Sequence, residues 1–188
     1  MISFVAYLIL FAIYVLVVFL TPDRNPTEKD LQPSGEDRFT QLATFLFLGW
    51  WVAFLLPMFT SPWEAMPVWP SVGVGVFLFA LGSVVRKVAV QTLGRLFTYE
   101  LCIREEHRIV QEGIYRWIRH PSYTGTLLEA LGMLVAARSL YGLCLFVVAA
   151  GWLFFLRIRR EEGMMIDQFG DEYRDYMKRT YRLIPFVF

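Results

Sequence analysis

PSYTGTLLEALGMLVAARSLYGLCLFVVAAGWLFFL, residues 121 to 156, is an apolar stretch that only Glu129 and Arg138 interrupt. Its length and the polar break at Arg138 and Ser139 suit a hairpin of two rather short membrane-spanning helices. Arg138 is then expected to lie at the outer membrane surface as an end anchor. The stretch therefore predicts an all-α membrane protein.

Three further charge-free runs precede the hairpin. Residues Ile2 to Leu20 are long enough to cross a bilayer, which takes roughly 20 helical residues. No Lys or Arg precedes this run and Thr21-Pro22-Asp23 follows it, so we interpret it as a retained transmembrane helix and not as a signal peptide.

The second and third runs, Phe39 to Trp63 and Ala65 to Val85, are separated by a cluster of prolines that marks a turn. With the hairpin they make five spanning helices. We expect one domain over residues 1–188, with three helices in 1–91 and a cofactor-binding connection, the hairpin and an amphipathic tail in 92–188.

The composition excludes several classes of protein. Of 188 residues, 56% are hydrophobic and 19% are charged, which is too apolar for an ordinary soluble domain. The net charge of +1 gives no sign of a nucleic-acid partner. Cys102 and Cys144 show no CxxC spacing, so neither a disulfide framework nor a metal site is expected.

Cations show which loops face the cytoplasm, because cytoplasmic loops collect Lys and Arg. The polar region from Arg86 to His120 holds seven of the eighteen cations, and the tail from Arg157 to Phe188 holds seven more. The Pro-rich turn holds none. We therefore expect the N-terminus outside and both basic regions at the cytoplasmic side, in the inner membrane if the source is bacterial.

The polar tail contains an amphipathic pattern. Apolar and aromatic residues recur at helical spacing, which predicts a helix packed on the membrane face or on the 86–120 region. Gly170-Asp171 is expected to break this helix, with Asp171 as a new N-cap. The residues are Met165, Phe169, Tyr173, Tyr176 and Met177.

The sequence contains none of the common soluble-enzyme motifs, and Gly73-Val74-Gly75 indicates close helix packing and not a dinucleotide fingerprint.

Polar groups gather where the hairpin enters the membrane. Pro121 is expected to begin a helix, with Arg119 and His120 beside its positive end, a place that suits an anionic group. The alternative is that Arg119 snorkels to the surface and His120 caps the helix.

Arg157, with Glu161 and Glu162 behind it, would meet Arg119 and His120 if the hairpin closes. Interfacial charges of this kind are candidates for function, although the two glutamates also suit a solvated helix start. Glu129 is costly in lipid and is expected to face the interior, where it pairs with a donor or lines a cavity.

Four motifs in this order resemble the isoprenylcysteine carboxyl methyltransferase family in its short prokaryotic form. The RHPxYxG part alone also occurs in phospholipid N-methyltransferases, thiol methyltransferases and membrane sterol reductases. The motifs are HRIVQEGIY at 107–115, RHPSYTG at 119–125, RIRREE at 157–162, and FGDEY at 169–173 with Tyr176 and Met177.

The resemblance implies an S-adenosylmethionine pocket open to the cytosol and a lipid-side entrance for the substrate. Arg157 and Glu161 would lie toward the reacting centre as catalytic residues. The implied cofactor-binding residues are His107, Val110, Gly113, Tyr115, Arg119, His120, Tyr123 and Glu162.

The resulting hypothesis is an S-adenosylmethionine-dependent methyltransferase that acts on the carboxylate of a lipophilic substrate such as a prenylated cysteine. Membrane lipids would be its other partners, and it would be a monomer or a weak homo-oligomer. A phospholipid amine or a thiol as methyl acceptor, an NADPH-dependent membrane reductase, and a non-catalytic membrane protein are the alternatives.

Overall fold

The computed structural model describes residues 2–20, 52, 55–56, 66–97 and 108–185. Within these residues every element is a helix, apart from one isolated bridge between Ile118 and Tyr181, which confirms the predicted all-helical class for this part of the chain. The elements are α1 (Ile2–Leu20), α3 (Val68–Leu93), the 3₁₀ turns η2 (Gly94–Leu96) and η3 (Gly113–Arg116), α4 (Pro121–Ala137), α5 (Leu140–Phe169) and α6 (Asp171–Arg179).

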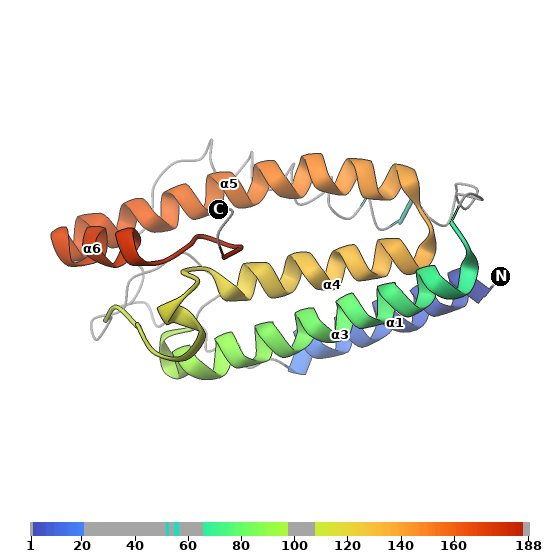
Figure 1. Cartoon of the computed structure of the whole chain (residues 1–188), viewed down its shortest axis with the longest axis horizontal. Helices are drawn as coiled ribbons and strands as arrows, with labels where there is room; N and C mark the ends of the chain where they lie inside the picture. The colour runs from blue at the N-terminus through green and yellow to red at the C-terminus, as the bar shows by residue number, and fades with distance from the viewer. Residues whose placement is uncertain (1, 21–51, 53–54, 57–65, 98–107, 186–188) are drawn as a thin grey trace.

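The four long helices run side by side, with α4 between α3 and α5 and α1 beside α3 (Figure 1). The predicted helical hairpin with its turn at Arg138 and Ser139 is confirmed, but α5, with 30 residues, is not the short helix expected. Arg138 adopts a left-handed conformation with φ of 57° after α4, and the Ser139 side chain accepts a hydrogen bond of 3.1 Å from the backbone N–H of Gly142 at the start of α5.

Glycines bring α3 and α4 into close contact. A Cβ placed on Gly132 would lie 2.5 Å from the carbonyl oxygen of Gly75, and a Cβ on Gly82 would lie 2.6 Å from that of Gly125. Close approach through small residues is typical of helix pairs in membranes. The packing role predicted for the Gly73-Val74-Gly75 stretch is therefore confirmed for Gly75, whereas Gly73 faces open space.

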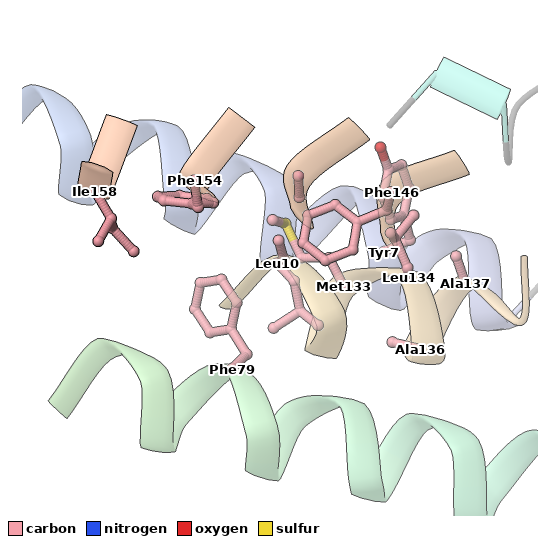
Figure 2. Packing of buried hydrophobic residues seen from close by; sticks show 12 residues of the cluster. Tyr7, Leu10, Phe79, Met133, Leu134, Ala136, Ala137, Phe146, Phe154 and Ile158 are labelled. Carbon is pink, nitrogen blue, oxygen red and sulfur yellow. The ribbon is translucent and has the colours of Figure 1, made fainter. Parts of the chain in front are cut away.

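A buried apolar cluster joins all four long helices (Figure 2). Met133 and Leu134 of α4 are at its centre and are almost fully buried. Their neighbours include Tyr7 and Leu10 of α1, Phe79 of α3, and Phe146, Phe154 and Ile158 of α5.

Two predicted boundaries differ from the structure. Arg86 was expected to open the polar cytoplasmic region after the third charge-free run, but α3 continues past it to Leu93, close to the expected boundary at residue 91, because Arg86 is buried against Glu129. The tail was expected to begin at Arg157, but α5 continues to Phe169. Gly170, with φ of 56°, does break the helix, although it occupies the N-cap position of α6 that we expected for Asp171.

Two segments, Val68–Leu96 and Leu140–Phe169, are long and apolar enough to cross a membrane. Their outward side chains include Phe77 on α3 and Val148 on α5, which are 65% and 71% exposed. Such apolar exposure suits lipid better than water. The second predicted span, 39–63, lies outside the described residues except for Val52, Leu55 and Leu56, which are helical, and the count of five spans stays a prediction.

Candidate active site

The N-terminal end of α4 positions the candidate residues Arg119 and His120. Pro121 is the first helical residue, as predicted, and its fixed φ and missing N–H suit that position. His120 precedes it as the N-cap residue, with φ of −122° and ψ of 57°, and its side chain makes no capping hydrogen bond. The backbone of His120 does occupy the N-cap position, but its imidazole lies beside Glu161 and Glu162, so His120 does more than cap the helix.

Residues 180–183, which we call the C-terminal segment, pair with the chain just before α4. The backbone N–H groups of Arg119 and His120 donate to the carbonyls of Tyr181 and Arg182, at 2.8 and 3.1 Å, and Tyr181 donates to Trp117 at 2.9 Å. Thr124 adds a side-chain hydrogen bond of 2.8 Å to the carbonyl of Leu183. This short parallel pairing fixes the backbone that carries Arg119 and His120.

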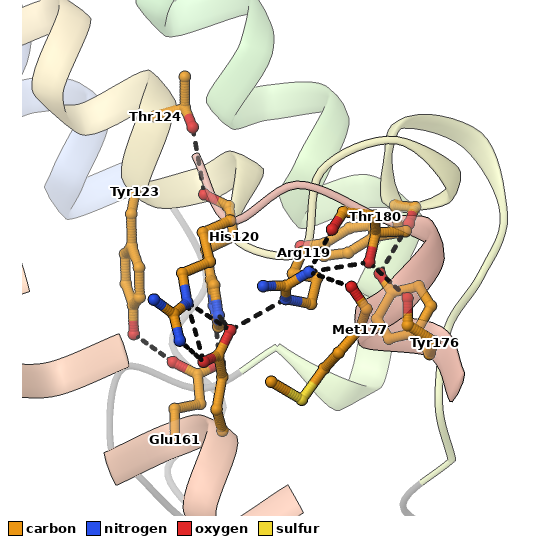
Figure 3. Close-up of polar contacts among 11 residues, drawn as sticks. Arg119, His120, Tyr123, Thr124, Glu161, Tyr176, Met177 and Thr180 are labelled. Carbon is orange, nitrogen blue, oxygen red and sulfur yellow. Dashed lines mark hydrogen bonds and ion pairs between the residues drawn. The ribbon is translucent and has the colours of Figure 1, made fainter. Parts of the chain in front are cut away.

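Arg119 is buried inside the protein. Its Nε donates to Glu162 Oε1 at 2.9 Å, and its Nη1 donates to the carbonyl of Met177 at 3.0 Å and to the carbonyl and hydroxyl oxygens of Thr180 (Figure 3). Only 7% of the side chain is exposed. Arg119 therefore does not snorkel to the membrane surface but joins α5, α6 and the C-terminal segment.

Glu162 is the anionic partner of this basic cluster. Besides the bond from Arg119, it accepts hydrogen bonds from Nε of Arg182 at 3.2 Å on Oε1 and 3.0 Å on Oε2, and Nη2 of Arg182 lies 3.0 Å from Oε2. His120 Nε2 lies 3.5 Å from Oε1. The anionic group that the sequence predicts beside Arg119 and His120 is thus, at least in part, a carboxylate of the chain itself.

Glu161, one residue earlier, belongs to a second set of contacts. Its Oε2 accepts a hydrogen bond of 2.7 Å from the Tyr123 hydroxyl, and its Oε1 lies 3.6 Å from His120 Nδ1. The Tyr123 hydroxyl in turn accepts a hydrogen bond of 2.7 Å from Arg157 Nε. The expectation that the closed hairpin brings Arg157, Glu161 and Glu162 to Arg119 and His120 is confirmed.

The charge environment of His120 follows from these contacts. Burial alone would lower the pKa of His120, but the charges and hydrogen bonds of Glu161 and Glu162 outweigh burial and raise the pKa above its usual value. Burial, together with the nearby Glu161 charge, raises the pKa of Tyr115, so its phenol stays protonated. The two carboxylates thus favour the protonated form of His120, against the effect of burial.

The connection before α4 contributes the remaining candidates. Gly113 has φ of 55°, which favours glycine, and a Cβ there would lie 3.4 Å from the Thr92 hydroxyl of α3. Tyr115 is buried, and its carbonyl accepts a hydrogen bond of 2.6 Å from the Tyr176 hydroxyl of α6. Of the two packing surfaces predicted for the tail helix, α6 therefore uses the 86–120 region. Val110 is half-buried just before η3, and His107 lies outside the described residues.

Glu129 has partners on α3. It accepts a hydrogen bond of 2.8 Å from the Ser83 hydroxyl and pairs with Arg86 Nη1 at 3.5 Å, and it is completely buried. The expectation of an interior position with a donor is therefore confirmed.

Sequence reasoning missed the contribution of Thr180 and Arg182. The available signal was the short run from Thr180 to Ile184, rich in β-branched and aromatic residues and ended by Pro185, which is typical of an extended strand. Its pairing partner could not be read from the sequence.

Residues 74–167 match the family model of the isoprenylcysteine carboxyl methyltransferase (ICMT) family. A probable protein-S-isoprenylcysteine O-methyltransferase of Oryza sativa subsp. indica is 34% identical over 116 residues, which are 61% of each chain. Protein-S-isoprenylcysteine O-methyltransferase B of Arabidopsis thaliana is 39% identical over 60% of this chain and 58% of its own. This chain thus spans about three fifths of the length of these plant relatives.

Protein-S-isoprenylcysteine O-methyltransferase of Dictyostelium discoideum is 29% identical over 92% of this chain and 70% of its own. Among solved structures, the eukaryotic intramembrane Ras methyltransferase ICMT superposes with a TM-score of 0.66 and 22% identity, over 98% of this chain and 67% of that one. The two chains therefore share a fold.

Proposed function

Because this chain belongs to the isoprenylcysteine carboxyl methyltransferase family, we propose that it is an integral membrane methyltransferase that uses S-adenosylmethionine. The proposed acceptor is the carboxylate of a lipophilic molecule such as a prenylated cysteine. The observation that carries the proposal is the cluster, buried at His120 and Glu162, in which Glu161 and Glu162 of α5 meet Arg119, His120 and Tyr123 at the start of α4.

The cluster fits the chemistry of the cofactor. His120 Nε2 is buried and lies 3.5 Å from Glu162 Oε1 without a well-formed hydrogen bond to any described residue, so its N–H can donate to a ligand. The rings of Tyr123 and Phe154, whose centroids are 5.1 Å apart, present aromatic faces that favour a nearby cation. The residues that would hold the cofactor are His107, Val110, Gly113, Tyr115, Arg119, His120, Tyr123 and Glu162.

When bound, S-adenosylmethionine supplies a methyl group on a positively charged sulfur. Arg157 would hold the acceptor carboxylate, since a guanidinium binds a carboxylate through two parallel hydrogen bonds. Its Nε is already directed by the Tyr123 hydroxyl, which Glu161 fixes from the other side. The three side chains thus orient the acceptor for attack.

A carboxylate acceptor is ionised near neutral pH and needs no general base. The protein therefore contributes by aligning the two reactants and by excluding water from the site. Fixed alignment of two reactants lowers a barrier by roughly 7–11 kcal/mol, and exclusion of water removes hydration from the carboxylate. Burial of Arg119, His120 and Glu162 is consistent with such a dry site.

We further propose five spanning helices with the cluster at the cytoplasmic side. Support comes from the two apolar helices α3 and α5 and from the cations, which gather in the connection before α4 and in the tail.

Methyl transfer with purified protein tests the function. The protein in lipid nanodiscs, incubated with methyl-labelled S-adenosylmethionine and a prenylated cysteine, is expected to give a labelled product whose methyl is released by base, as an ester is. A base-stable product would instead indicate an amine or thiol acceptor and overturn the carboxylate assignment. Failure of isothermal titration to detect binding of S-adenosylhomocysteine would overturn the cofactor assignment.

A further inference from the structure

Arg182 lies in the candidate active site although it is distant in sequence from the other site residues. It lies in the C-terminal segment, and its backbone carbonyl is tied to the N–H of His120 at 3.1 Å. The side chain reaches Glu162 on α5 from there. One residue thus contacts both the backbone of His120 and the carboxylate beside its ring.

The Arg182 guanidinium makes a bidentate contact with the Glu162 carboxylate. Nε lies 3.2 and 3.0 Å from the two Glu162 oxygens, and Nη2 lies 3.0 Å from Oε2. Arg119 approaches Oε1 at 2.9 Å with a different guanidinium. Two arginines therefore share one buried carboxylate, and together they restrict it to one position and one rotamer.

The two arginines differ in what else they do. Arg119 also binds Met177 and Thr180 and is 7% exposed, so it is part of the packed interior. Arg182 keeps 27% of its side chain exposed. A residue at the rim of a buried cluster can orient a ligand-contacting group while the interior stays packed.

We propose that Arg182 is a positioning residue of the cofactor site, which holds Glu162 in the orientation that binds S-adenosylmethionine and sets the charge around His120. This inference rests on the proposed function for its ligand. The contact between Arg182 and Glu162 itself is tested without the ligand.

The variants are Arg182→Gln, Arg182→Lys and, as the control, Arg179→Gln. Arg179 lies at the exposed end of α6, where its Nε donates to the carbonyl of Asp175. Isothermal titration with S-adenosylhomocysteine is expected to give a Kd about tenfold higher for Arg182→Gln, the scale of one charge-assisted hydrogen bond. Arg182→Lys should recover part of the loss, and Arg179→Gln should bind as the unaltered protein does.

A second measurement separates positioning from folding. The chain contains two histidines, so ring signals of labelled histidine can be assigned with a His107→Gln variant. Loss of the Arg182 cation should raise the pKa of His120 further, because the negative charge of Glu162 is then less compensated. The other charged or titratable groups around His120 stay in place: Arg119, Tyr115, Tyr123, Arg157 and Glu161.

Unchanged ligand affinity in Arg182→Gln would overturn the proposal. So would a drop in melting temperature that accompanies the affinity loss while the His120 titration stays unchanged, since Arg182 would then be a folding contact only. If the unaltered protein bound no S-adenosylhomocysteine, the proposed function would fail, and the titration would still decide whether Arg182 acts on Glu162 and His120.

Discussion

His120 lies between two carboxylates, with Nδ1 3.6 Å from Glu161 and Nε2 3.5 Å from Glu162. Its ring also stacks on Tyr123, with centroids 5.6 Å apart. Burial by itself opposes the protonated form, but the two carboxylates prevail and raise the pKa of His120. The positive charge of His120 therefore stabilises the folded state.

A pH dependence follows at this residue. Folding raises the pKa of His120, so protonation of His120 stabilises the folded state. This stabilisation is complete below the pKa of histidine in the unfolded chain, about 6.5, and is lost as the pH rises through the pKa of His120 in the folded state. We expect the melting temperature in detergent to fall as the pH rises above about 6.5, and we expect His120→Gln to flatten this slope. Differential scanning fluorimetry across a pH series measures it. Loss of the slope in His107→Gln, with His120→Gln unchanged, would contradict the assignment.

Most of the cluster was predictable residue by residue. Arg119 and His120 directly precede α4, and Glu162 lies in the part of α5 that a closed hairpin brings beside them, so sequence order and membrane depth were sufficient to group them. Arg182 was not predictable in this way, because its position depends on how the chain turns back after α6. No periodic pattern encodes that turn.

The contact between α3 and α4 rests on glycine. A methyl group on Gly132 would meet backbone atoms of Gly75 and Phe79 at 2.5 and 2.6 Å, and backbone cannot rotate away. Gly132→Ala is expected to destabilise the fold by about 1–3 kcal/mol, the usual cost of overpacking. Gly151→Ala on α5 is the control, because a Cβ there meets open space. Equal melting temperatures for the two variants would rule out close packing at Gly132.

Glu129 and Arg86 join the same two helices by charge. Removal of one partner from a buried ion pair costs about 3–5 kcal/mol, whereas replacement of both by apolar residues of similar size is often neutral. We expect Glu129→Leu and Arg86→Met each to lower the melting temperature strongly, and the double variant to be more stable than either. Lys87→Gln, on the exposed side of α3, should change little. A double variant with the summed loss would show that the two residues are not coupled.

The same pair explains why Arg86 lies inside α3 and not in the polar cytoplasmic region that the sequence predicted. Arg86 is a cation, and cations in an apolar run usually mark the membrane boundary. Here Arg86 has a carboxylate partner 43 residues later, so it stays inside the helix. Likewise α5 continues beyond Arg157, because its charged residues meet partners on α4 and the C-terminal segment and not water alone.

The predicted topology places the two ends of α5 on opposite sides of the membrane. Tyr141, at its start, is exposed and expected outside, and Lys178 of α6 is exposed and expected in the cytoplasm. In a background with Cys102 and Cys144 replaced by Ser, an impermeant maleimide should label Tyr141→Cys in intact cells. It should label Lys178→Cys only after the membrane is permeabilised. The reverse pattern would invert the orientation.

The pairing of residues 180–183 with residues 117–120 also determines when the site can assemble. The helices α3, α4 and α5 precede this segment in the chain and can insert while synthesis is still under way. Arg119 and Glu162 acquire their remaining partners only after residues 180–183 have left the ribosome. A chain interrupted before this segment would keep α3, α4 and α5 but lack the contacts that complete the site.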